Sequence, residues 1–209
     1  MQGIDKALVS LGRIPMILRT VRAMAASDSM TEILVVTRND LIEPIKDLCR
    51  NEKKFVCAVP GGSTRAESVI NGLRAVETEF AAIHDGARPF VTPEIIDAAV
   101  EAAVQLGAAA PAVPVKDTIK VAETQKILST PDRRTLFAVQ TPQVFKRVQI
   151  LAALEQALKD GVPLTDDCSA AENAGMPVYL TKGSNENIKI TTPVDLAFCE
   201  AILKWREQS

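Results

Sequence analysis

The chain has 209 residues, with 24 lysines and arginines against 26 aspartates and glutamates. This length favours one domain with a sizeable core. The net charge of −2 gives no electrostatic reason to expect DNA or RNA as a partner. No apolar run approaches the roughly 20 residues of a membrane span, and the N-terminus lacks the pattern of a signal peptide. We therefore expect a cytoplasmic protein with no membrane or nucleic-acid partner.

The cysteines do not indicate a metal site. Cys49, Cys57, Cys168 and Cys199 show no CxxC spacing, and only one histidine is present to join them. Such a set predicts reduced and mostly packed thiols in a reducing compartment. Zinc is not expected.

Strand-like and helix-like segments alternate through the first half of the chain. Apolar and β-branched runs predict strands at 33–37, 55–59, 80–83 and 109–115. Helical spacing predicts helices over about 39–51, 65–76 and 93–106, with Thr64 and Thr92 as caps and Pro93 in the first turn of the last. This alternation indicates an α/β protein with a mostly parallel sheet between two helical layers.

The pattern changes after Asp117. Residues 117–143 contain two short alternating pieces, 118–121 and 126–129, which are typical of a hairpin that leaves the sheet. Because an exposed two-stranded arm is only marginally stable alone, we expect it to pack on a second subunit. Further along, the pattern predicts helices at 147–159, 166–174 and 193 to about 205, and a strand at 178–181.

Polar residues follow the predicted strand 80–83. His84, Asp85 and Arg88 come directly after it, and Gly86 keeps the backbone open. Ligands of open α/β sheets bind at the carboxyl ends of strands, where Asp85 could hold a hard cation and Arg88 could fork onto a phosphate. Alternatively, Asp85 and Arg88 only pair with each other. His84 is expected to be a hydrogen-bonded residue of the strand end rather than an acid or base.

Three further clusters could bind ligands. The run 61–65, Gly-Gly-Ser-Thr-Arg, lies between a strand and a helix N-terminus, where free N–H groups are available, and Ser68 could point into the same pocket. The run 165–167, Thr-Asp-Asp, is first of all a helix N-cap with acids that favour the helix dipole. Lys189, flanked by isoleucines in a short extended segment, is first of all a solvated lysine.

Taken together, six motifs in one order resemble the 2-C-methyl-D-erythritol 4-phosphate cytidylyltransferase family over essentially the whole chain. They are Pro60–Gly62 with Arg65 and Ser68–Gly72, His84–Pro89, Ala110–Lys120, Asp132–Gln143, Thr165–Asp167 and Asn187–Pro193. The resemblance implies a three-layer α/β/α Rossmann-like nucleotidyltransferase fold whose protruding β-arm, about 117–143, embraces a second subunit. It also implies transfer of CMP from CTP to 2-C-methyl-D-erythritol 4-phosphate, with release of pyrophosphate, with Mg²⁺ or another divalent cation, in the nonmevalonate isoprenoid pathway.

The resemblance assigns roles to individual residues. Lys6 would stabilise charge on the phosphates, and Arg133 and Lys189 would hold the attacking phosphate in line. Nucleotide binding is implied for Gly61, Gly62, Ser63, Arg65, Ser68, Asp85 and Gly86. Acceptor binding is implied for Asp85, Arg88, Thr118, Arg133, Thr141, Thr165 and Lys189, with Asp85 also the metal ligand. Through the arm, Thr118 and Arg88 could serve the neighbouring subunit's site.

The implied chemistry requires no base from the protein. A phosphate monoester is already largely dianionic at neutral pH, so the site has to neutralise charge and align two anions in line. The single histidine is therefore no obstacle.

The chain departs from the family pattern at its start. Family members begin with an apolar strand and a glycine-rich loop that cradles the triphosphate, and Met1 aligns just after that loop. We therefore expect one cytidylyltransferase domain, residues 1–209, that is N-terminally truncated and lacks one central strand. Either the start site is placed about 20 residues too late, or the chain is genuinely short and weak or inactive. Gly86 also stands where the family more often has alanine.

Other functions remain open on the sequence. Ribitol-5-phosphate cytidylyltransferase resembles the same scaffold and shares the segment 140–143, and a molybdopterin guanylyltransferase is a more remote alternative. A third possibility is a nucleotide-binding dimer that is inactive through loss of the N-terminal loop.

Overall fold

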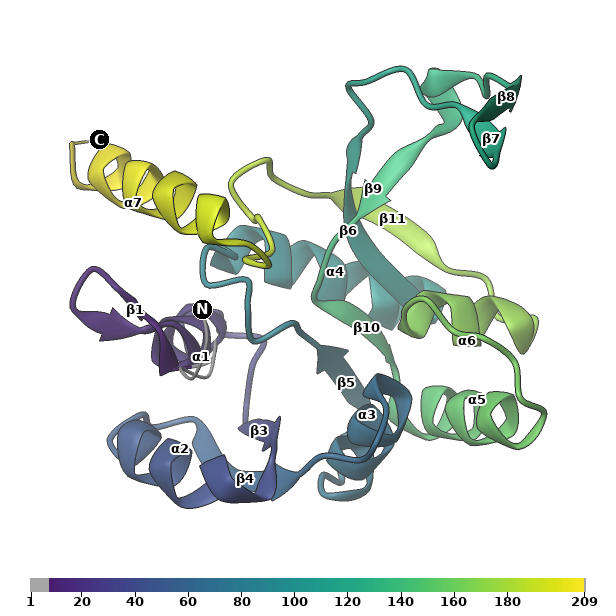
Figure 1. Ribbon diagram of the computed structural model, residues 1–209. Helices are drawn as coiled ribbons and strands as arrows, with labels where there is room; N and C mark the ends of the chain where they lie inside the picture. Colours follow the sequence, from purple (N-terminus) through teal and green to yellow (C-terminus); the bar gives the residue numbers. More distant parts are fainter. Residues whose placement is uncertain (1–7, 209) are drawn as a thin grey trace.

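A computed structural model describes residues 8–208 of the chain (Figure 1). Its helices are α1 (Met16–Ala25), α2 (Ile42–Cys49), α3 (Arg65–Arg74), α4 (Pro93–Leu106), α5 (Arg147–Lys159), α6 (Asp167–Asn173) and α7 (Pro193–Gln208). Its strands are β1 (Ser10–Leu11), β2 (Ile14–Pro15), β3 (Ile33–Thr37), β4 (Phe55–Pro60), β5 (Phe80–Ile83), β6 (Ala108–Pro114), β7 (Val121–Glu123), β8 (Lys126–Ser129), β9 (Phe137–Val139), β10 (Gln143–Lys146) and β11 (Tyr179–Lys182).

The central sheet has five strands in the order β11-β6-β10-β5, with β9 added to β6. Strand β11 is parallel to β6, whereas β10 is antiparallel to both β6 and β5. Strands β5, β6 and β11 therefore run in one direction with β10 inserted among them. A separate parallel pair is formed by β3 and β4. The predicted α/β class with a mainly parallel sheet is confirmed, while β9 and β10 were not predicted.

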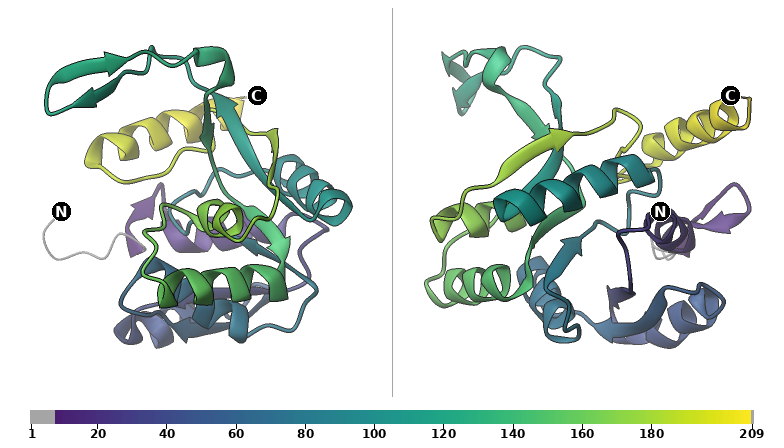
Figure 2. Two further views of the ribbon diagram at one scale, coloured as in Figure 1. Left: turned by 90° about the vertical axis from the view of Figure 1, so that its right-hand side faces the viewer. Right: turned by 180° about the vertical axis from the view of Figure 1, so that it is seen from behind.

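Helices cover both faces of the strands, which gives three layers (Figure 2). On β10, Phe145 packs with Ile150 of α5 on one face, whereas its neighbour Val144 packs with Ala99 and Ala103 of α4 on the other. This is the alternation of a pleated strand that is buried on both sides. Helices α3, α5 and α6 form the first layer, and α1, α2 and α4 form the second.

A slot separates β3 from β5. Within the described part of the chain, β3 pairs only with β4 and β5 pairs only with β10. Between them lies a cavity of about 390 Å³, lined by residues 33–36 of β3 and 80–83 of β5 and walled by side chains of α1 and α3. Protein interiors contain few voids larger than a water molecule. The slot therefore divides the strands into a small lobe, β3 and β4 with α2, and a large lobe around the central sheet.

Most predicted elements are present within a residue or two of their expected bounds. Thr64 caps α3 through a capping box with Glu67, as expected. Thr92 occupies the N-cap of α4, as expected, but its side chain accepts no hydrogen bond from a backbone N–H. Helix α1 and the β1-β2 hairpin were not predicted.

The predicted hairpin is present and its second strand has the expected bounds, because β8 is Lys126–Ser129 and pairs with β7, but the other bounds of the arm differ from those expected. Its first strand is β7, Val121–Glu123, rather than 118–121, and Thr124 at φ 56° starts the turn. Residues 137–143 do not belong to the arm, because β9 pairs with β6 and β10 enters the central sheet.

The cysteines are free, and Cys49, Cys168 and Cys199 are buried. Burial raises the pKa of the thiols of Cys49 and Cys199 to about 11, so these are inert packing residues, as predicted. None of the helices between residues 8 and 208 combines the length and apolar character needed to cross a bilayer.

Candidate active site

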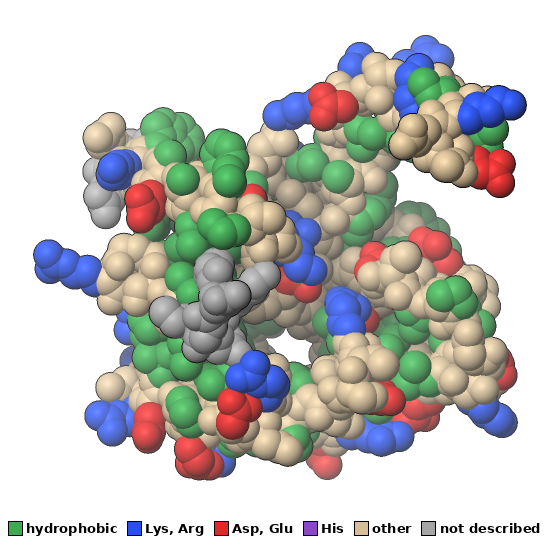
Figure 3. All heavy atoms as spheres, viewed as in Figure 1, with side chains coloured by type: hydrophobic (Ala, Val, Ile, Leu, Met, Phe, Trp, Pro, Cys, Tyr) green, Lys and Arg blue, Asp and Glu red, His purple; other side chains and the backbone are tan. Residues whose placement is uncertain are grey.

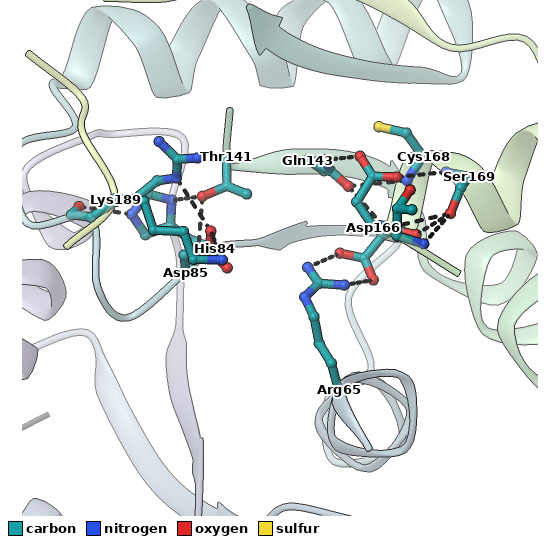
Figure 4. A network of polar contacts seen from close by, with 12 residues as sticks. Arg65, His84, Asp85, Thr141, Gln143, Asp166, Cys168, Ser169 and Lys189 are labelled. Carbon is teal, nitrogen blue, oxygen red and sulfur yellow. Dashed lines mark hydrogen bonds and ion pairs between the residues drawn. The ribbon is translucent and has the colours of Figure 1, made fainter. Parts of the chain in front are cut away.

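Asp85 lies two residues after the end of β5 and is held by two cations, of which Lys189 is labelled in Figure 4. Its Oδ2 is 3.1 Å from Nζ of Lys189 and 3.2 Å from Nε of Arg88. Burial alone would raise the pKa of Asp85, but the charges and hydrogen bonds of Lys189 and Arg88 lower it overall. The structure thus joins three residues from two of the predicted motifs, with Asp85 ionised and Lys189 half exposed.

Arg88 is largely buried and faces its own protomer. Besides Asp85, its Nη1 donates to the carbonyl oxygen of Asn187 at 2.6 Å. This bond ties the loop after β5 to the segment that carries Lys189. Arg88 therefore pairs with Asp85, as one alternative predicted, and also anchors a second loop.

Lys189 is presented by the packing of its neighbours. Ile188 and Ile190 pack against the cluster of Leu11 and Phe90, and the N–H of Ile190 donates to the carbonyl of Ala87 at 2.9 Å. No strand forms here, but the expected alternation holds, because the isoleucines face the core and the lysine faces Asp85.

His84 belongs to a chain of hydrogen bonds that ends at Asp85. Its Nε2 lies 3.1 Å from the carbonyl of Arg88, which can only accept, so Nε2 carries the proton. Its Nδ1 then accepts from the hydroxyl of Thr141 at 2.9 Å, and that oxygen accepts from the N–H of Asp85 at 3.1 Å. Loss of solvation lowers the pKa of His84 to about 4. His84 is thus a neutral structural residue, as expected.

Thr141 is the only residue of the segment 140–143 for which a role was predicted from the sequence. The Thr141–Pro142 peptide is cis, and a buried glutamine stands on each side of it. Gln140 accepts from the backbone N–H of Ser184 and from Nδ2 of Asn187. The sequence signal for this role is the pair of glutamines beside an apolar strand, because buried amide side chains need hydrogen-bond partners.

The glycine turn 61–64 follows β4 on the small lobe. A Cβ on Gly62 would lie 2.2 Å from Cβ of Glu67, so only glycine fits there. The N–H groups of Ser63 and Thr64 donate to the carboxylate of Glu67, and the N–H of Gly62 donates to Oγ of Ser68 at 3.0 Å. The turn is therefore ordered by side chains of α3. The backbone N–H groups that were predicted to bind a ligand donate to these side chains instead.

The other predicted residues are distributed over several elements. Thr165 precedes α6 and is exposed. Thr118 and Arg133 are exposed on the arm, where Nη1 of Arg133 donates to the carbonyl of Lys116 at 2.7 Å. The arm stands away from the body of the protein (Figure 3). Within the described residues, Arg133 hydrogen-bonds Lys116 and Lys189 pairs with Asp85, and no bond joins Arg133 to Lys189. Lys6 lies outside the described residues.

The residues present fit a magnesium ion only partly. No group of three or more histidine, cysteine or acidic side chains between residues 8 and 208 is arranged for a metal. Asp85 is a single carboxylate, already paired with two cations. Such a site suits Mg²⁺ when most of its ligands are substrate phosphates and waters.

The three layers (Figure 2), with Asp85, Arg88 and Lys189 gathered after the carboxyl end of β5, define an α/β protein with a candidate ligand site at the strand ends. A family model described as 2-C-methyl-D-erythritol 4-phosphate cytidylyltransferase matches residues 1–205. The chain belongs to this family.

Relatives and solved structures agree. The chain is 43% identical over 208 residues to the 2-C-methyl-D-erythritol 4-phosphate cytidylyltransferase of Geobacillus thermodenitrificans, covering 98% of this chain and 91% of the relative. A crystal structure of 4-diphosphocytidyl-2C-methyl-D-erythritol synthase from Anaerococcus prevotii is similar, with a TM-score of 0.90, 30% identity and coverage of 98% and 92%. The Thermus thermophilus cytidylyltransferase follows with a TM-score of 0.83, 31% identity and coverage of 95% and 94%.

Proposed function

We propose that the protein transfers CMP from CTP to 2-C-methyl-D-erythritol 4-phosphate, in the nonmevalonate route to isoprenoid precursors. The observation that carries this proposal is the family membership over nearly the full chain, together with relatives of that name at about 43% identity. The cationic cluster at Asp85 supports it, because a phosphate acceptor needs cations rather than a base. We assign the protein to the cytoplasm.

In the proposed reaction, an oxygen of the acceptor phosphate forms a bond to the α-phosphorus of CTP. The bond between that phosphorus and the oxygen bridging to the β-phosphate breaks, and pyrophosphate leaves with its electron pair. No proton has to be removed from a dianionic nucleophile. Lys189 would draw the acceptor phosphate into line and offset its charge as the two anions approach.

Asp85 is the proposed carboxylate ligand of Mg²⁺. The cation would lower repulsion between the phosphates when it is bound. Lys189 and Arg88 hold Asp85 ionised, which keeps it ready to bind a cation. Lys189 would exchange its contact with Asp85 for the acceptor phosphate.

The assay measures pyrophosphate release with CTP and Mg²⁺ in the presence of methylerythritol phosphate, of ribitol 5-phosphate, or of no acceptor. Faster release with methylerythritol phosphate than with ribitol 5-phosphate supports the proposal. Faster release with ribitol 5-phosphate would reassign the acceptor. CTP binding by calorimetry without release under any condition would favour the noncatalytic nucleotide-binding dimer.

We also propose a homodimer formed through the arm. Every residue of β7 and β8 is exposed, including Val121, Ile127 and Leu128, and these strands pair only with each other. Two strands alone are marginally stable, and a cluster of exposed apolar side chains is typical of an interface. A partner would cover this surface and bring Arg133 to a second site.

The dimer is tested by light scattering during gel filtration. Ile127→Lys should shift the protein from dimer to monomer at micromolar concentration, because it places a charge in the proposed contact. Val148→Lys is the matched control, since Val148 is equally apolar and 66% exposed on α5. A monomeric wild type, or equal dissociation by both variants, would contradict this arrangement.

A further inference from the structure

The N-termini of α3 and α6 are joined by an ion pair across the molecule (Figure 4). Nη1 and Nη2 of Arg65, the first residue of α3, donate to the two carboxylate oxygens of Asp167, the first residue of α6, at 2.8 and 2.6 Å. The side chain of Asp167 has no exposed surface, whereas that of Arg65 is 41% exposed. A two-point fork fixes orientation as well as distance.

Asp167 is itself fixed to the central sheet. Oε1 of Gln143, on β10, accepts from the N–H groups of Asp167 and Cys168, both at 3.0 Å. Nε2 of Gln143 donates to the carboxylate of Asp166 at 2.7 Å. The first turn of α6 therefore cannot shift without breaking bonds to a buried strand residue.

The fork joins the two predicted halves of the site. Arg65 follows the glycine turn 61–64, the predicted nucleotide side, whose strand β4 belongs to the small lobe. Asp167 follows Thr165, on the predicted acceptor side. Because the slot leaves β3 without a strand bond to β5 in the described chain, strand pairing does not set the distance between these halves.

Stability alone does not explain the pair. Burial of a carboxylate is costly, and burial raises the pKa of Asp167 despite the nearby Arg65. Replacement of a buried ion pair by packed apolar residues is often neutral or stabilising. The pair is better explained by the geometry that it fixes.

We propose that Asp167 is a positioning residue that acts through Arg65. It touches neither substrate, and it holds the turn 61–64 at a fixed distance and orientation from Thr165. In this proposal, Arg65 fixes the position of the turn and does not itself bind the nucleotide. The effect on substrate binding rests on the proposed function, whereas the coupling of the two loops does not.

The test compares Asp167→Asn, Arg65→Gln and the double variant. Hydrogen exchange is measured for peptides covering residues 60–64 and 163–168, and CTP affinity by calorimetry. Each single variant should speed exchange in the turn 61–64 several-fold and weaken CTP binding about tenfold. The double variant should be no worse than either single one, since both remove the same contact.

Arg74→Gln is the matched control. It breaks an ion pair of similar length, 2.7 Å to Glu155, from the same helix to α5, and should change neither readout. Arg65→Lys keeps the charge without the fork, and should recover thermal stability but not CTP affinity.

Additive effects of the two single variants would overturn the proposal, as would exchange changes confined to α6. Full recovery of CTP affinity by Arg65→Lys would also contradict it, because a charge alone would then suffice. If the wild type fails to bind CTP, the proposed function fails, and the exchange measurements still decide whether the loops are coupled.

Discussion

The stability of the folded protein should depend on pH through its only histidine. His84 is held neutral, with a pKa of about 4 instead of 6.5, chiefly because it loses solvation. The unfolded chain binds a proton at this residue below about pH 6.5, whereas the folded chain does not until about pH 4. The contribution is therefore complete above pH 6.5 and is lost progressively as the pH falls towards 4.

The magnitude follows from the difference between the two pKa values. At about 1.4 kcal/mol per unit, the free energy of unfolding should fall by on the order of 3 kcal/mol between pH 7 and 4. The carboxylates of Asp85, Asp97 and Asp195 have lowered pKa values and lose their contributions only at lower pH. Asp167, whose pKa is raised by burial, acts in the opposite sense as the pH falls, so the contribution of His84 is isolated by comparison with a variant that lacks only the histidine.

Urea unfolding from pH 7 to 4 measures this difference. His84→Gln removes the titrating group and keeps an amide donor towards Arg88. We expect the variant to be less stable at pH 7 but to have a flatter profile, so that the two curves converge near pH 4. Parallel curves would refute the reasoning, since the pH dependence would then arise elsewhere.

Three other outcomes are expected. Lys189→Ala should lower cytidylyl transfer at least a hundredfold in the pyrophosphate assay, because its ammonium offsets charge in the transition state; an unchanged rate would remove Lys189 from the mechanism. Gly62→Ala should lower the melting temperature and cost about 1–3 kcal/mol of unfolding free energy, since its Cβ would overlap Glu67. Gly86→Ala should be nearly neutral, because its Cβ meets only the end of Ile17 at 3.1 Å. A short extended apolar peptide should bind the slot and raise the melting temperature, and the same peptide with a central proline should not.

Much of the fold followed from local patterns. The strands 33–37 and 80–83 and the helix 147–159 have the predicted bounds, because apolar periodicity and caps decide such elements locally. Strands β9 and β10 were missed because a distant strand, β6, determines their pairing. Helix α1 lies in a region for which no helix was predicted.

The site residues likewise fall into those that could be predicted from the sequence and those that could not. Asp85 and Arg88 were identified from residue type and position and Lys189 through the family resemblance, and the three side chains come together. The roles of Gln143 and Asp167 could not be predicted, because they depend on which helix N-termini meet across the sheet. The predicted pair of Arg133 and Lys189 stays a prediction, since it requires a second protomer.

The slot between β3 and β5 also affects how the protein should open. Because no strand bond crosses it in the described chain, we expect residues 33–60 to unfold as a unit while the central sheet stays intact. The glycine turn that follows this unit would then lose its anchor to β4 and be held only by α3 and the ion pair of Arg65. Mild heating or denaturant should therefore abolish nucleotide recognition before the global transition, so that loss of function would precede loss of structure.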